Sequence, residues 1–284
     1  MSNVKVDSVQ VLRGEYEWLL AEEVPSMTKQ LKSFIQACLQ KVNILSSPAH
    51  TIKGNNFLLS LPNSDAVKGL INVAGDSVIK AELKFKFPKY ASNGIGTFIF
   101  EQCPWKLQQL QDTSNHLKMA FEELKEQEYN SSLLEKQRVN QLLDQIMMSL
   151  SCAKNSLLVP QKQSMSQIMG SNCQKVLNPP IPEEILVNFH VNCDKLVFDV
   201  FLLNVLTTNT PNQKYVNDLS AVGSMFEFEG RWFEIANKYE IICTVPWLKD
   251  MIVWINTAQQ LCQQLKDKLK IFDTLAPNLE RKNY

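Results

Sequence analysis

The chain has 284 residues, a length that predicts about two domains. Lys plus Arg number 29 and Asp plus Glu also number 29, so the formal net charge is +0. This balance argues against a whole-chain nucleic-acid footprint and against an acidic disordered protein. Hydrophobic residues make up 45% of the chain, ample for a core, and glycines number 9. Composition therefore indicates a folded chain with mixed α and β structure and disfavours glycine-rich phosphate-binding loops.

The sequence predicts a cytoplasmic protein. No apolar run follows a basic region near the beginning of the chain, so we expect no signal peptide. The longest apolar stretch, 196–206, contains Asp199 and Asn204 and is shorter than the roughly 20 residues of a membrane-spanning helix. The 7 cysteines are odd in number and form no C-x-x-C pair, so we expect reduced thiols, several of them in the core.

A long helix is predicted to begin at Val11 and to end before Ser46. Apolar residues recur there at steps of three and four, which places them on one stripe of a helix. Pro25 falls inside this run and should remove one ladder hydrogen bond, so that the helix kinks or breaks near 23–24. The predicted stripe consists of Tyr16, Leu20, Val24, Met27, Leu31, Phe34, Cys38, Val42 and Leu45.

The next segment changes to the two-residue period of β-strands. Apolar residues at odd positions in 79–87 alternate with charged ones, which predicts a strand with one buried and one solvated face. A second strand, 67–74, is joined to it by the turn signal Gly75-Asp76. Two further strands, 55–61 and 97–102, complete a predicted four-stranded meander.

Two helices should follow the meander. We expect the first to open at Trp105, with Pro104 in its first turn, and the second to end at Pro160. Both carry apolar residues in heptad spacing, and the short polar break between them, 127–132, predicts antiparallel neighbours. The two seams consist of Leu107, Leu110, Ser114, Leu117, Phe121 and Leu124, and of Val139, Leu143, Ile146, Leu150, Ala153 and Leu157.

The remaining chain repeats the alternation of helix and strand. Residues 159–183, rich in Gln, Ser and Pro, should be a linker with one helical turn at 165–169. About five strands follow, including a central strand at 195–206 and a hairpin around Glu229-Gly230. The expected strands are 187–191, 195–206, 225–228, 232–235 and 239–245. Pro246 begins the last helix, with the stripe Trp247, Met251, Trp254, Ala258, Leu261, Leu265, Leu269 and Phe272.

This order predicts an α+β protein, elongated and two-lobed, with an antiparallel four-helix bundle built from non-contiguous segments and an antiparallel β lobe. The predicted bundle lobe comprises 11–46, 104–158 and 246–273. The β lobe comprises 52–103 and 184–245, with 159–183 as the linker. Because both lobes draw on separated segments, a single cut of the chain should not separate them.

The sequence lacks the standard catalytic constellations. His50, His116 and His190 have no metal-ligand spacing with one another or with the cysteines, and we expect them to be structural or exposed. Gly94-Ile95-Gly96 lacks the third glycine of a dinucleotide-binding loop, and adjacent acids such as Glu122-Glu123 suit solvated faces better than acid–base chemistry. We therefore predict no enzyme activity, no catalytic, cofactor-binding or metal-binding residues, and no cofactor.

Two other patterns each have two interpretations. Lys80, Lys84, Lys86 and Lys89 either protect an edge strand, the interpretation we prefer, or form a patch for an acidic partner or phospholipid head groups. The leucines at 110, 117 and 124 either form a seam within the chain, which we also prefer, or a zipper for dimerisation. We accordingly expect the isolated chain to be monomeric.

Six strings, spread in order over nearly the whole chain, carry a resemblance to a known family. They are Glu15-Tyr16-Glu17-Trp18-Leu19-Leu20 with Glu23-Val24, Val67-Lys68-Gly69, Trp105-Lys106-Leu107-Gln108-Gln109-Leu110-Gln111-Asp112 with Asn115-His116, Gly223-Ser224-Met225-Phe226-Glu227, Val245-Pro246-Trp247-Leu248 with Asp250, and Leu261-Cys262-Gln263-Gln264-Leu265-Lys266-Asp267-Lys268. Each string alone is weak, but together they resemble the Rogdi family, closest to its animal members.

The resemblance implies a non-enzymatic protein with a helical lobe and a β lobe, similar to the small subunit of the yeast RAVE complex. The animal counterpart of that complex contains rabconnectin-type WD-repeat proteins and promotes assembly of the vacuolar proton pump, the V-ATPase. The implied partners are those proteins and peripheral-sector subunits of the pump, with no nucleic acid. The implied location is cytoplasmic, peripherally on synaptic vesicles or endolysosomal membranes through partners, with a nuclear or nuclear-envelope pool as a further option. The resemblance assigns no residue roles, so the partner-binding residues stay unknown.

Three functional hypotheses therefore remain open. The first is an adaptor in pump assembly, which would support vesicle acidification and synaptic function. The second is an enzyme with an unrecognised site between the lobes, against which the scarcity of histidine argues. The third is a nuclear zipper-type regulator, which would need a basic region before its heptads, and none is present.

Overall fold

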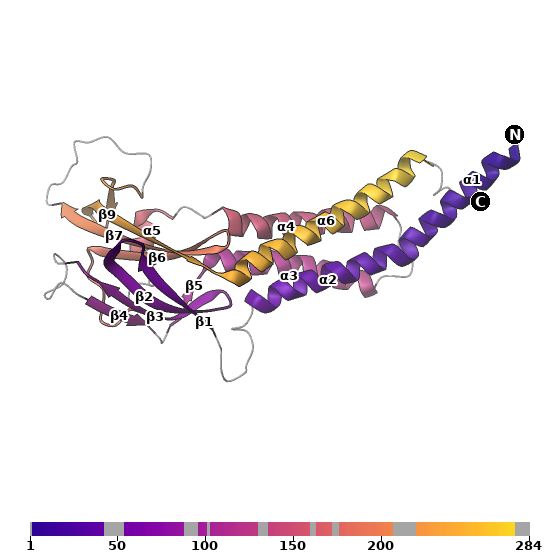
Figure 1. Cartoon of the computed structure of the whole chain (residues 1–284). Helices are drawn as coiled ribbons and strands as arrows, with labels where there is room; N and C mark the ends of the chain where they lie inside the picture. The colour runs from indigo at the N-terminus through magenta and orange to yellow at the C-terminus, as the bar shows by residue number, and fades with distance from the viewer. Residues whose placement is uncertain are drawn as a thin grey trace. The chain divides into compact units, whose positions relative to one another are not determined.

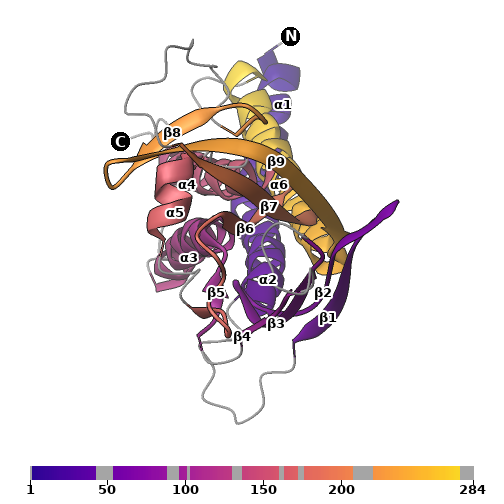
Figure 2. The same cartoon turned by 90° about the vertical axis from the view of Figure 1, so that its left-hand side faces the viewer.

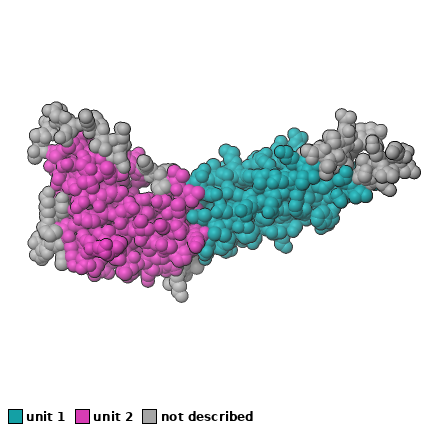
Figure 3. Space-filling model, turned by 45° about the horizontal axis from the view of Figure 1, so that its top comes forward, with its two compact units in different colours: residues 1–41, 112–155, 250–284 teal, residues 42–111, 156–249 magenta. Residues whose placement is uncertain are grey.

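A computed structural model of the chain describes residues 2–42, 54–87, 96–100, 103–129, 136–159, 163–171, 176–206 and 220–275. It contains helices and antiparallel sheets, so the fold is α+β as predicted (Figure 1). The chain divides into two compact units, coloured teal and magenta in Figure 3. Unit 1 comprises 1–41, 112–155 and 250–284, and unit 2 comprises 42–111 and 156–249.

Unit 1 is helical throughout its described residues. Its first helical run contains α1 (Ser2–Trp18), the π-helical turn η1 (Leu19–Glu23) and α2 (Val24–Val42). The other runs are α3 (Gln108–Tyr129), α4 (Lys136–Leu158) and α6 (Pro246–Leu275), each of which lies in unit 1 for most of its length. The first run begins at Ser2, well before the predicted start at Val11.

Pro25 changes the helix in the turn that precedes it. Pro25 has no N–H to donate, so the ordinary ladder cannot continue through it. The Val24 N–H donates to the carbonyl of Leu19, five residues back, which is the π-helical pattern. The wider turn places Leu19 in the buried stripe instead of the predicted Leu20. Further along α2, Ile35 is buried and the predicted Phe34 is half-buried.

The heptad seams of α3 and α4 are confirmed, because all their members are buried except the half-buried Phe121. The predicted helix start at Trp105 is wrong. Trp105–Lys106 form a short strand, β5, and the Leu107 N–H donates to the Asp76 carbonyl at 2.8 Å, so α3 begins only at Gln108. In α6 most of the predicted stripe is buried, but Ile255 and Cys262 take the places of the predicted Trp254 and Leu261, which each lie one position earlier in the sequence.

Side-chain contacts join the helical runs of unit 1 in pairs. Between α2 and α6, Cys38 Sγ donates to the Met251 carbonyl at 3.8 Å, and between α6 and α4, Gln259 Nε2 donates to Ser151 Oγ at 3.0 Å. Between α3 and α4, Thr113 Oγ1 donates to the Ala153 carbonyl at 3.3 Å. Between α2 and α3, the Lys32 ammonium lies 5.8 Å from the centroid of the Phe121 ring. Each helical run therefore contacts two of the other three.

Unit 2 contains two antiparallel sheets. The first has the order β1 (Asn55–Leu61), β2 (Ser64–Ala74), β3 (Ser77–Phe85) and β4 (Gly96–Phe100), with β5 also paired to β3. The predicted meander is thus confirmed, with its turn at Gly75-Asp76 between β2 and β3. Gly75 has a φ of +56°, a conformation in which its lack of a Cβ avoids strain.

The second sheet has the order β6 (Ile185–Asn192), β7 (Lys195–Leu206), β9 (Arg231–Thr244) and β8 (Met225–Phe228). β7 is central and buried on both faces along most of its length, as predicted. The two strands expected at 232–235 and 239–245 are one strand, β9. Its register with β7 shifts between Leu202 and Leu203, and the pairing continues on both sides of this irregularity.

The two sheets pack face to face (Figure 2). The Phe87 and Tyr239 rings stack at 5.3 Å, and Trp105 meets Phe189 edge-on at 5.3 Å. The opposite face of the second sheet is covered by α5 (Met165–Gly170), which lies where a helical turn was predicted. Its Met165 joins a buried cluster with sheet residues, so part of the predicted linker 159–183 belongs to the core of unit 2.

Candidate interaction surfaces

The two histidines among the described residues lie in different elements. His50 is outside the described residues, His116 is half-buried in α3, and His190 lies in β6. Burial raises the pKa of the Cys38 and Cys262 thiols to about 12, so both stay protonated at neutral pH. Within the described ranges, no group of three or more His, Cys, Asp or Glu side chains is placed to hold a metal ion. No helix in the same ranges is long and apolar enough to cross a bilayer.

His190 belongs to an ionic cluster on the second sheet that sequence reasoning missed. Its Nδ1 lies 3.3 Å from Oδ2 of Asp199, and Lys238 Nζ lies 3.6 Å from Oδ1 of Asp199 and 3.5 Å from Oε2 of Glu240. Burial raises the pKa of Asp199 and lowers that of His190. The buried carboxylate is balanced by two cationic or polar neighbours, which suits a structural role. The sequence signal for this cluster was Asp199, a charged residue inside the largely apolar central strand β7.

The edge-strand interpretation of the lysines is wrong. Lys80 and Lys84 lie in β3, and Lys86 follows its last residue. Because β3 lies between β2 and β4, it has no free edge along most of its length. Lys84 Nζ pairs with Oε1 of Glu82 at 2.8 Å, and Lys86 Nζ lies 3.5 Å from Oδ2 of Asp65. Lys68 holds the pKa of Asp65 below its usual range. Lys89 lies outside the described residues.

The same outer face of the first sheet carries a row of apolar side chains. Leu58 is paired with Leu70, and Glu82 is paired with both Leu70 and Ile99, so the four residues cross the sheet in register. Leu58, Leu70 and Ile99 are exposed, Leu58 to 73%. A shallow hollow of about 180 Å³ lies beside Leu70 and Ile99. This face is a mixed apolar and charged surface.

The leucine spacing on α3 is accounted for within the chain. Leu110, Leu117 and Leu124 are all buried in the isolated structure. Their side chains are therefore used by the seam and are not presented for a second chain, in agreement with the preferred interpretation.

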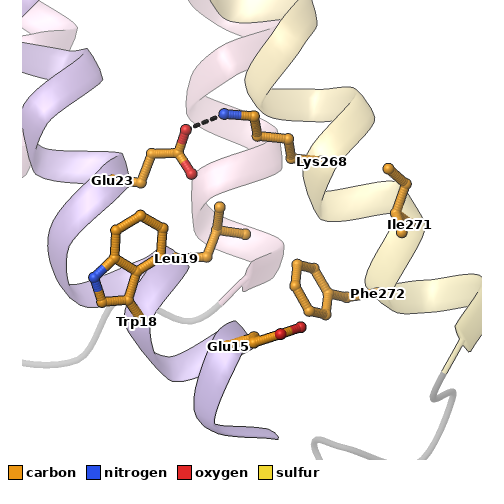
Figure 4. A pocket seen from close by; sticks show the side chains of 7 residues that line it. All are labelled: Glu15, Trp18, Leu19, Glu23, Lys268, Ile271 and Phe272. Atoms are coloured by element: carbon orange, nitrogen blue, oxygen red, sulfur yellow. Dashed lines mark hydrogen bonds and ion pairs between the residues drawn. The ribbon is translucent and has the colours of Figure 1, made fainter. Parts of the chain in front are cut away.

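A pocket of about 400 Å³ lies in unit 1 between the α1–η1 junction and the last turns of α6 (Figure 4). Its lining residues are Glu15, Trp18, Leu19, Glu23, Lys268, Ile271 and Phe272. Leu19 is buried, whereas Trp18 is 58% exposed and Ile271 is 52% exposed. The pocket thus has an apolar floor and exposed apolar rims, contributed by helices that are far apart in sequence.

Two contacts join the α1–η1 and α6 walls of this pocket. Lys268 Nζ pairs with Oε1 of Glu23 across it, as the dashed line in Figure 4 shows. The Tyr16 and Phe272 rings lie 5.5 Å apart at an angle of 54°. The π-helical turn adjoins the pocket, because it places Leu19 inward directly after Trp18. Sequence reasoning missed the pocket, since the pairing of α1 with α6 is not encoded in either periodicity.

These features define an α+β protein whose described residues present exposed apolar and charged surfaces suited to protein contacts. A sequence profile described as "Rogdi leucine zipper containing protein" matches residues 15–233. The chain is 34% identical to "Protein rogdi homolog" of Danio rerio over 93% of this chain and 94% of that protein. It is 32% identical to the Homo sapiens homolog over 93% of each chain, and 30% identical to "Protein rogdi" of Drosophila melanogaster over 92% and 88%. The chain belongs to the Rogdi leucine zipper family.

Proposed function

We propose that this protein is a non-catalytic adaptor subunit of a RAVE/rabconnectin-type complex that promotes assembly of the vacuolar proton pump. The family membership supports this role through the resemblance described above. The structural observation that carries it is the presence of an exposed apolar surface in each compact unit: the pocket at Trp18 in unit 1 and the row at Leu58 in unit 2. An adaptor needs separate surfaces for separate partners.

The proposed scaffold for the first surface is an antiparallel four-helix bundle. The pairwise contacts α2–α6, α6–α4, α4–α3 and α3–α2 close a ring of four helical runs, which supports this arrangement. Such a bundle would be stiff, because its seams bury long apolar stripes from segments distant in sequence. A stiff support keeps the helix faces that contact a partner in fixed positions.

The proposed partners are rabconnectin-type WD-repeat proteins and peripheral-sector subunits of the V-ATPase. The proposed location is the cytoplasm, with peripheral attachment to synaptic vesicles or endolysosomal membranes through those partners, and with a nuclear or nuclear-envelope pool as a further option. In this role the protein does no chemistry of its own, and the isolated chain is a monomer. Its effect on vesicle acidification, and on synaptic function, would come from bringing pump sectors together.

The test combines affinity purification with a measurement of luminal pH. The tagged full-length chain, purified from cells that normally express it, should bring down a rabconnectin-type protein and peripheral pump subunits. Depletion of the chain should raise the luminal pH of acidic vesicles, and re-expression should restore it. Normal acidification after depletion, together with no pump subunit in the purified material, would refute the adaptor role.

A further inference from the structure

We propose that the pocket between α1–η1 and α6 is a docking site for an amphipathic helix that carries basic residues, presented by a partner protein. The inference rests on the adaptor role and deepens it by naming one surface and the chemistry of its partner. It is carried by the pocket's apolar walls, by the charge at its mouth and by the kind of secondary structure that forms it.

The apolar walls are suited to anchor a side chain of a partner. Trp18 and Ile271 stand on opposite walls, more than half exposed, above the buried Leu19 (Figure 4). Tryptophan is among the residues that contribute most to binding energy when a partner covers them. A volume of about 400 Å³ exceeds what one aliphatic side chain fills, so more than one anchor residue can enter.

The charge on the α1 side of the pocket selects a basic partner. Residues 13–23 contain one Arg and four Glu, a net charge of −3 from one positive and four negative groups. Arg13 pairs with Glu17 at 3.2 Å, and Lys268 is engaged by Glu23. Glu15, which lines the pocket, has no ion-pair partner among the described residues, so its carboxylate is available at the mouth.

The same charge disfavours a second copy of this chain as the occupant. A two-fold contact in which the two α1 segments faced each other would bring two acidic segments together, and like charges across an interface weaken binding. The apolar anchors of a basic helix would instead enter the pocket while its Lys or Arg side chains meet Glu15.

The walls also favour a helix over an extended segment. Both walls are helices whose backbone groups are hydrogen-bonded internally, so they offer no strand edge for main-chain pairing. A partner must therefore bind through side chains on one face. An amphipathic helix presents anchors at positions i, i+3 and i+4, which fits a groove between two helices.

The test uses a synthetic 18-residue helical peptide of Leu and Lys, with Leu on one face; this length gives about five helical turns. A matched peptide has Glu in place of every Lys. Binding of each labelled peptide to the purified full-length chain is measured by fluorescence anisotropy. We expect saturable binding of the Lys peptide and at least about tenfold weaker binding of the Glu peptide. Trp18→Ala should weaken Lys-peptide binding at least about tenfold, and Glu15→Lys about three- to tenfold.

Met148→Ala is the matched control, since Met148 is an exposed apolar residue of α4 that does not line the pocket. It should leave the peptide affinity unchanged, and circular dichroism should show all variants folded. If Trp18→Ala disturbs folding, Ile271→Asp replaces it with the same expected loss. Equal binding of both peptides, or Lys-peptide binding that none of the pocket variants reduces, would overturn the inference. A dimer in sedimentation that Trp18→Ala dissociates would overturn it in favour of a second copy.

The outcomes separate this inference from the adaptor role. A wild-type chain that co-purifies with pump subunits but does not bind the Lys peptide overturns the docking site alone. A chain that binds the Lys peptide through Trp18 but brings down no pump subunit, and whose depletion leaves acidification normal, overturns the adaptor role and leaves the docking chemistry standing.

Discussion

The two units hold together by different physical means. In the helical unit, backbone hydrogen bonds are made within each helix, so segments distant in sequence are joined only by side chains such as Leu117 and Ile146 on the buried seams. In the β unit, the backbone itself joins distant segments, as in the full-length pairing of β7 with β9. We therefore expect unit 1 to depend on the volume of its seam residues, and unit 2 to combine that dependence with strand pairing.

The difference extends to the surfaces. A helical unit can leave a gap between two helices without losing any backbone hydrogen bond, and the pocket beside Trp18 is such a gap. A sheet has no such freedom, because each strand is held by its neighbours. The exposed apolar row of unit 2 is accordingly flat, with only a shallow hollow beside Leu70 and Ile99.

The largest predicted effect lies in the sheet core. Phe198 is fully buried on the central strand β7, and its ring stacks on Phe189 at 4.5 Å. Phe198→Ala should lower the free energy of unfolding by about 3–5 kcal/mol, because it leaves a cavity between the two sheets. Urea denaturation measures this loss. An unchanged midpoint would mean that strand pairing alone holds this part of unit 2.

A slightly smaller effect is expected in the helical seams. Leu117→Ala or Ile146→Ala should cost about 2–5 kcal/mol, since both side chains are buried against other helices. Met119→Ala is the control: the side chain is exposed two residues away on α3, so the cost should stay within about 0.5 kcal/mol. Similar losses for Leu117 and Met119 would contradict the assigned seam.

The ionic cluster on the second sheet predicts a dependence on pH. Burial holds the pKa of His190 below its usual value of about 6.5, with Asp199, Glu240 and Lys238 as its charged neighbours. As pH falls through about 6.5, the unfolded chain binds this proton first, so stability decreases on acidification. Asp199 acts with the opposite sign, because its raised pKa makes stability decrease as pH rises from about 4.

Urea midpoints at about pH 7.5 and about pH 5.5 test the histidine contribution. His190→Gln should reduce the loss of stability between these values, whereas His116→Gln on α3 serves as the comparison in unit 1. An identical pH dependence for the wild type and His190→Gln would show that the folded chain takes up the proton as readily as the unfolded one.

The smallest effect is expected on the solvated face of β3. Lys84 pairs with Glu82, but both side chains are about half exposed, and exposed pairs contribute about 0–1 kcal/mol. Lys84→Met should therefore change the free energy of unfolding by no more than about 1 kcal/mol. The triple variant of Lys80, Lys84 and Lys86 to Glu should stay folded. Loss of binding to phosphatidylserine vesicles in that variant would support the phospholipid interpretation of the lysines.

The sequence by itself determined most of the elements and, for several of them, the buried face. The heptad seams on α3 and α4, the hairpin turn at Gly75-Asp76 and the doubly buried strand β7 could all be predicted, because they depend on period and turn chemistry within a few residues. The class α+β followed from the alternation of those periods.

Tertiary structure alone decided which elements distant in sequence became neighbours. The lysines of β3 could not be assigned correctly, because the period of a strand does not say whether β4 covers its edge. The partnership of His190 with Asp199, the strand β5 and the pocket between α1 and α6 likewise depend on pairs of segments far apart in the chain. Periodicity is a local property, whereas each of these features is created by contact between residues that no local pattern connects.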